Sequence, residues 1–142
     1  MTWKEVLPEE AAKNRLYGFS GWLLAAYVAG AATFLAWLGL GIYSFALGTD
    51  DRSTVGIVRT TMGSLAALQA LFIVPFLVLA PLRHHAMPSM VMVCIWFGVA
   101  VNMLHSTALV AASYIVWAAI FTIYLLRSKR VNVTYLHRVP AA

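Results

Sequence analysis

The stretch FSGWLLAAYVAGAATFLAWLGLGIYSFAL, from Phe19 to Leu47, runs for 29 residues without a charged side chain. A helix that crosses the hydrocarbon core of a bilayer needs about 20 mostly apolar residues. The segment therefore predicts a transmembrane helix. Its excess length predicts that this helix tilts or extends beyond the hydrocarbon.

Three further apolar segments follow along the chain, at about Thr60–Leu82, Pro88–Leu104 and Thr107–Leu126. Only a tight turn separates the last two, and one helix over both would be nearly 60 Å long at about 1.5 Å per residue. The hydrocarbon core is about 30 Å thick, so we count two passes there. The prediction is an all-α integral membrane four-helix bundle over residues 19–126.

The composition agrees with a membrane protein. Hydrophobic residues make up 62% of the 142 residues and charged residues 11%, with a mean hydropathy of +0.81. Soluble domains have about 25% charged residues. The single cysteine, Cys94, excludes a disulfide framework and a cysteine-based zinc site. The net charge of +5 indicates anchoring at the membrane surface rather than nucleic-acid binding.

The charge distribution predicts the topology. With four passes, the N-terminal segment 1–18 and the basic tail 127–142 lie on one side of the membrane. Arg52 and Arg59 lie on the other side. The first side holds eight basic residues, which are Lys4, Lys13, Arg15, Arg83, Arg127, Lys129, Arg130 and Arg138. The positive-inside rule then predicts cytoplasmic termini in a multi-pass protein of the cell inner membrane.

The sequence predicts no catalytic, cofactor or metal site. No Asp, Glu, Lys or Arg lies within the four predicted segments, which argues against a proton-coupled pump, a drug antiporter or a voltage sensor. His84 and His85 flank the second segment, and His105 lies at the far end of the third. That separation is about 30 Å along a helix, too far for two histidines to share one haem.

Small residues spaced by four predict close helix packing in the first segment. Ala25 pairs with Ala29 in this way, and Ala26 pairs with Gly30. Such faces let helix backbones approach closely, either within the bundle or against a partner. Gln69 lies near the middle of the second segment, where we expect an interhelical hydrogen bond or a substrate contact.

The basic tail is the third candidate interaction site. Arg127, Lys129 and Arg130 follow the last apolar segment directly. Each base near the cytoplasmic surface contributes about 1 kcal/mol of attraction to anionic lipid. We therefore expect the tail to lie on the membrane surface or to dock on a partner protein.

This C-terminal stretch also resembles a known family pattern. Tyr124 is followed by SKRVNVTY over residues 128–135, and Gly21, Trp22 and Leu23 open the first segment. Similar residues, in a chain of similar length with four helices, occur in a bacterial membrane family called domain of unknown function 2569. The match departs at Asn132, where that family favours lysine, and at Tyr135, where it favours phenylalanine. The resemblance implies a bacterial inner-membrane protein and no particular activity.

The sequence thus favours a non-enzymatic accessory or scaffold subunit that binds another membrane protein. Two alternatives stay open. One is a homo-oligomeric transporter or channel module for a hydrophobic or lipid-like substrate, with Gln69 and Asn102 as its best polar residues. The other is the membrane anchor of a redox enzyme, with His84 or His85 near a cofactor held by a partner.

Overall fold

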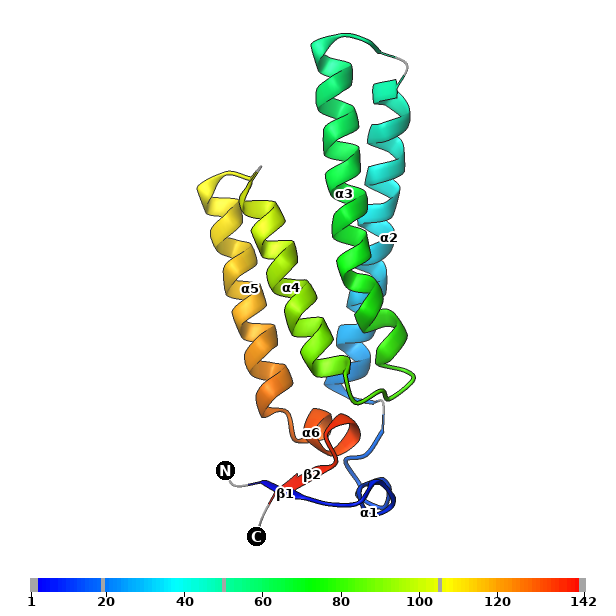
Figure 1. Ribbon diagram of the computed structural model, residues 1–142, viewed down its shortest axis with the longest axis vertical. Helices are drawn as coiled ribbons and strands as arrows, with labels where there is room; N and C mark the ends of the chain where they lie inside the picture. Colours follow the sequence, from blue (N-terminus) through cyan, green and yellow to red (C-terminus); the bar gives the residue numbers. More distant parts are fainter. Residues whose placement is uncertain (1–2, 19, 50, 105, 141–142) are drawn as a thin grey trace.

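The computed structural model describes residues 3–18, 20–49, 51–104 and 106–140. Four long helices dominate this part of the chain (Figure 1). They are α2 (Trp22–Thr49), α3 (Thr54–Leu79), α4 (Met87–Met103) and α5 (Ala108–Arg127).

Three of these helices, α2, α3 and α5, are long and apolar enough to cross a membrane. The fourth, α4, is also apolar but has only 17 residues, the lower limit for a span. Large apolar side chains face outward along the helices, among them Leu109, which is 83% exposed, and Leu35, which is 65% exposed. The predominantly helical fold is therefore confirmed, and the three long apolar helices fit a membrane-embedded protein. The count of four passes stays a prediction.

The helices form two hairpins that diverge from a shared base. The α2–α3 hairpin and the α4–α5 hairpin meet where α3 connects to α4, and they separate toward their tips (Figure 1). The buried core lies at this base, where Leu23, Phe76, Met87 and Leu125 bring the four helices together. Among the described residues, α2 packs extensively on α3 but not on α5. The two hairpins are therefore joined mainly through α3 and α4, and α2 and α5 diverge from each other.

Glycines allow the close contact between α2 and α3. A Cβ atom built on Gly63 of α3 would lie 2.6 Å from the backbone nitrogen of Phe45 in α2. A Cβ atom on Gly41 of α2 would lie 3.1 Å from the carbonyl oxygen of Gly63. No larger residue fits at such a crossing without separating the helices. Gly63 belongs to the small-residue spacing that runs on to Ala67.

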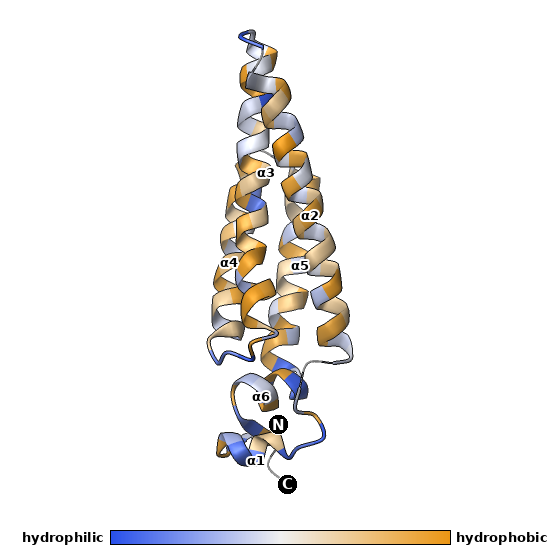
Figure 2. Cartoon of the chain, turned by 90° about the vertical axis from the view of Figure 1, so that its right-hand side faces the viewer, coloured by the Kyte–Doolittle hydropathy of each residue, from blue (hydrophilic) through white to orange (hydrophobic). Residues whose placement is uncertain are grey.

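The two ends of the chain fold together beneath the hairpins, in a unit we call the terminal cap (Figure 1). It contains β1 (Trp3–Glu5), α1 (Pro8–Ala12), α6 (Lys129–Tyr135) and β2 (Arg138–Pro140). The strands pair antiparallel, and an ion pair of 2.9 Å joins Arg138 to Glu5. Figure 2 shows the change from apolar helix shafts to this more hydrophilic end. The all-α prediction therefore lacked one small sheet.

Helix boundaries differ from the apolar boundaries at several ends, and the start of α3 differs most. Helix α3 begins at Thr54, six residues before the predicted start at Thr60, because the Ser53 hydroxyl accepts a hydrogen bond from the Gly56 amide and caps it. Arg59 consequently lies inside a helix, which corrects the prediction of charge-free helices. Helix α2 begins only at Trp22, since Gly21 adopts a positive φ of 62°.

Candidate functional site

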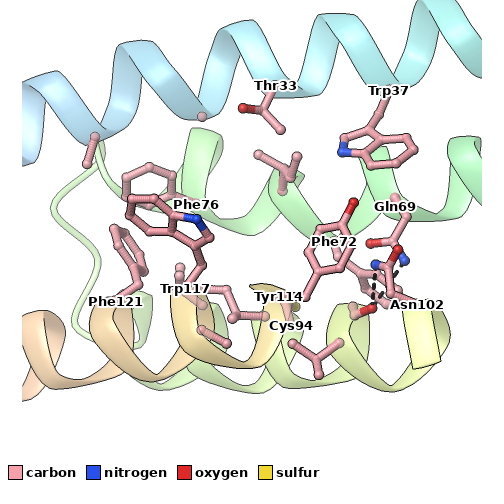
Figure 3. A pocket seen from close by; sticks show the side chains of 18 residues that line it. Thr33, Trp37, Gln69, Phe72, Phe76, Cys94, Asn102, Tyr114, Trp117 and Phe121 are labelled. Carbon is pink, nitrogen blue, oxygen red and sulfur yellow. Dashed lines mark hydrogen bonds between the residues drawn. The ribbon is translucent and has the colours of Figure 1, made fainter. Parts of the chain in front are cut away.

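A cavity of about 320 Å³ lies between the two hairpins (Figure 3). All four long helices line it, with α3 and α4 at the back and α2 and α5 at the sides. Its walls are mostly apolar and aromatic. The aromatic lining residues are Trp37, Phe72, Phe76, Tyr114, Trp117 and Phe121. We call this cavity the inter-hairpin groove.

Two buried amides face the inter-hairpin groove (Figure 3). Gln69 of α3 is 7% exposed and Asn102 of α4 is 3% exposed. Both donate to one acceptor, the carbonyl oxygen of Gly98, at 3.1 Å from Gln69 Nε2 and 2.9 Å from Asn102 Nδ2. The first bond crosses from α3 to α4, so the interhelical hydrogen bond expected of Gln69 is confirmed. It ties the two hairpins together above their base.

The oxygens of these amides accept no hydrogen bond within the described residues. The structure pairs Gln69 and Asn102 only through their nitrogens. No fully buried side-chain nitrogen or oxygen in that part of the chain is left without a partner. Gln69 Oε1 and Asn102 Oδ1 therefore reach accessible surface, and the surface beside both residues is the groove. The groove thus offers two acceptors in an apolar setting.

None of the described residues that line the groove carries a charged side chain. The other polar groups that line it are weak. They are the Thr33 hydroxyl, which donates to the Ala29 carbonyl oxygen at 2.8 Å, the Cys94 thiol, the Tyr114 hydroxyl and the two indoles. An ion in the groove would lack a counter-charge, and a buried ion without one is costly. The chemistry of the site therefore suits a neutral, mainly apolar molecule.

The small residues predicted on the first helix divide between two faces of α2. Ala26 and Gly30 line the inter-hairpin groove, where a Cβ atom on Gly30 would lie 3.2 Å from the Phe76 ring. Ala25 and Ala29 instead lie exposed on the outside of α2. The close α2–α3 packing therefore depends on Gly41 and Gly63, not on Ala25 and Ala29. The outer face of α2 has no partner within the described residues.

The predicted basic tail is a folded part of the terminal cap. Residues Val131 to Tyr135 are all buried, and the Tyr135 hydroxyl donates to the Ala80 carbonyl oxygen at 2.8 Å. Arg130 donates to the Ser20 hydroxyl, whereas Arg127 and Lys129 are exposed. The tail therefore docks on its own chain, and Arg127 and Lys129 are its bases left facing outward.

Burial also affects the chemistry of the tail. It raises the pKa of Tyr135 above its ordinary value of 10.0, and the nearby charge of Arg83 opposes this only in part. Tyr135 is therefore a neutral hydrogen-bond donor at every physiological pH. Its bond to Ala80 fixes α6 against the turn that follows α3.

The histidines form no metal site in the described part of the chain. The rings of His84 and His85 stack with their centroids 4.5 Å apart, and both residues are exposed. No group of three or more His, Cys, Asp or Glu side chains is placed to hold a metal among the described residues. His105 lies outside them.

The sequence analysis missed the role of Gly98. Asn102 lies in the last turn of α4, within the predicted segment Pro88–Leu104, and donates to the carbonyl four residues earlier. The spacing of Gly98 and Asn102, with an apolar residue at each intervening position, is the signal that marks this arrangement.

Comparison with known proteins adds no relative: no protein family, curated protein or solved structure matches this chain. The resemblance of its C-terminal stretch to domain of unknown function 2569 stays a prediction.

Proposed function

We propose that this protein binds a hydrophobic or lipid-like molecule in the inter-hairpin groove, within the membrane. The observation that carries the proposal is the pair of buried amides, Gln69 and Asn102, facing an otherwise apolar and aromatic cavity. Ligand sites have this character, since a few placed polar groups orient a molecule that apolar walls hold.

The size of the groove favours a small molecule over a partner helix. Ligand pockets span about 300–1,000 Å³, and the groove at about 320 Å³ is at the lower end. A helix with its side chains is about 10–12 Å across, so a partner helix would need a much larger trough than this groove. The groove instead accommodates the end of one lipid-like molecule, whose chain passes out between α2 and α5.

The proposed setting is the bacterial inner membrane, with four passes and the terminal cap in the cytoplasm. The excess of bases on the side of the chain ends supports this orientation. Exposed Arg127 and Lys129 extend from the cap side, where anionic lipid head groups attract them. The long α2–α3 hairpin then points to the outer face.

A second candidate function is that of an accessory or scaffold subunit. The observation that favours it is the exposed outer face of α2, where four alanines recur at alternating spacings of four and three residues. A helix of another membrane protein packs closely on such a face. The four are Ala25, Ala29, Ala32 and Ala36.

The test of the first proposal fills the groove with a side chain. Thr33 lines the groove from α2, and Thr33→Trp places an indole in it. Thr61→Trp is the matched control, because Thr61 is also exposed and also donates its hydroxyl to the carbonyl four residues earlier. Native mass spectrometry from mild detergent then counts the bound lipids.

We expect one retained molecule on the unmodified protein and on the Thr61→Trp control. We expect none on Thr33→Trp. Equal retention by all three proteins would contradict the proposal. A retained second polypeptide of fixed stoichiometry, lost from an Ala29→Leu variant, would support the accessory-subunit function instead.

A further inference from the structure

We infer that the molecule held in the inter-hairpin groove is a neutral lipid whose polar end carries a free hydroxyl group. The inference rests on the proposed function and adds the chemistry of the ligand. Its starting point is the way in which Gln69 and Asn102 share the carbonyl oxygen of Gly98.

Sharing one acceptor fixes which atoms of the amides remain available. Each amide has used one N–H on Gly98, at 3.1 Å and 2.9 Å. Gln69 Oε1 lies beside Gly98, where a Cβ atom built on that glycine would be 3.2 Å away. Each oxygen still has its capacity to accept, and an acceptor at an apolar surface is stabilised by a donor. Each amide also keeps a second N–H, so a ligand group that both donates and accepts a hydrogen bond suits the pair.

The charge of the surroundings decides what kind of donor fits. Among the described residues, the groove lining has no acidic side chain to balance an ammonium group and no basic one to balance a phosphate or carboxylate. A charged head group would have to lose its water without gaining an opposite charge. A hydroxyl donates to an amide oxygen and stays neutral, so it satisfies both requirements.

The aromatic residues near the amides give the hydroxyl a second partner. Trp37 and Tyr114 face the amide end of the groove from the two side helices (Figure 3). Their N–H and O–H groups are donors, and a hydroxyl oxygen is an acceptor as well. The Phe76 and Phe121 rings, in edge contact with centroids 5.8 Å apart, line the other end and suit an alkyl or isoprenoid chain.

Two kinds of membrane lipid carry this chemistry: a diacylglycerol with an alcohol, and an isoprenoid hydroquinone with a phenol. The experiment adds each to the purified protein and compares it with its O-methyl ether, which keeps the shape and loses the donor. Dioleoyl phosphatidic acid is the charged comparison. Native mass spectrometry gives the apparent Kd for every ligand.

At least one alcohol should bind about tenfold more tightly than its own ether, and the arm that shows the difference identifies the source. In Gln69→Leu, an apolar variant of similar size, we expect that difference to shrink to about threefold or less because Asn102 alone still accepts. The unmodified protein gives the decisive comparison whether or not the variant folds.

Three results would overturn the inference. They are ethers that bind as tightly as their alcohols in both arms, phosphatidic acid that binds most tightly, and binding that is the same in Gln69→Leu as in the unmodified protein. In each of these cases, ligands that bind the unmodified protein but not Thr33→Trp would still show that the groove is a binding site. Only its preference for a hydroxyl would then be rejected. Loss of all groove-dependent binding would reject the proposed function itself.

Discussion

At the scale of single residues, glycines determine how closely the first hairpin packs. The Gly63 Cα lies against the α2 backbone, with a built Cβ 2.6 Å from the Phe45 nitrogen. Gly63→Ala should therefore lower the free energy of unfolding by about 1–3 kcal/mol, as overpacking does. Gly39, in the partner helix α2, has nothing within 4 Å of a built Cβ and serves as the control. Gly39→Ala should leave the melting temperature in detergent unchanged or raise it. Equal losses in both variants would contradict close packing at Gly63.

Tyr135 gives a prediction with a defined pH dependence. Because burial raises its pKa above 10.0, the folded protein keeps a phenol proton that the unfolded chain loses above that pH. The folded state then binds more protons, so this contribution to stability is complete below pH 10 and declines as the pH rises further. Tyr135→Phe should cost about 1–2 kcal/mol at neutral pH, through the lost bond to Ala80.

Thermal unfolding in detergent at pH 7 to 11 measures both effects. The deficit of Tyr135→Phe relative to the unmodified protein should narrow above about pH 10, because the variant has no proton to lose there. Tyr43→Phe is the control, since Tyr43 is 65% exposed on α2. A deficit that stays constant to pH 11 would contradict the buried, protonated phenol.

At the scale of elements, hydropathy predicted the existence of the long helices but not all of their ends. The apolar segments at 88–104 and 107–126 correspond closely to α4 and α5. Helix α3 starts earlier because the Ser53 cap and the contact with α2 extend it into polar sequence. The fold of the terminal cap depends on contacts between distant residues, which no local sequence pattern encodes. One of them joins the Thr134 hydroxyl to the Gly18 amide, 116 residues away.

The candidate site was likewise only partly predictable from the sequence. Gln69 stood out because a polar residue in an apolar segment is conspicuous, and an interhelical hydrogen bond was one of the two roles predicted for it, without its partner helix. The groove itself was not predictable, because it depends on the divergence of the hairpins and on a carbonyl group, that of Gly98. Backbone acceptors are present at every position and carry no sequence signal.

At the scale of the whole molecule, the hairpins differ in length. Helix α2 has 28 residues and α4 has 17, about 42 Å and 26 Å at 1.5 Å per residue. In the proposed orientation, with the base at the cytoplasmic surface, the tip of the α2–α3 hairpin would extend beyond a hydrocarbon core of about 30 Å. The short α4–α5 hairpin would then end at the outer edge of that core.

Cysteine labelling tests this arrangement. A membrane-impermeant maleimide added to intact cells should label Arg52→Cys and Thr107→Cys, in the two outer loops. Lys13→Cys, beside α1, should react only after the membrane is permeabilised. Native Cys94 lies within α4 and should react little before detergent is added. Labelling of Lys13→Cys in intact cells would contradict cytoplasmic termini. Protection of Thr107→Cys would show that α4 does not cross.

The lipid-like molecule that we propose between the hairpins can be detected directly. The measurement is photo-crosslinking in membranes with a lipid that carries a diazirine on its chain, followed by peptide mapping. We expect adducts concentrated on groove residues such as Phe72, Phe76 and Phe121, and their loss in Thr33→Trp. Adducts spread equally over outward residues such as Leu35 and Ile123, and unchanged in that variant, would contradict the proposal.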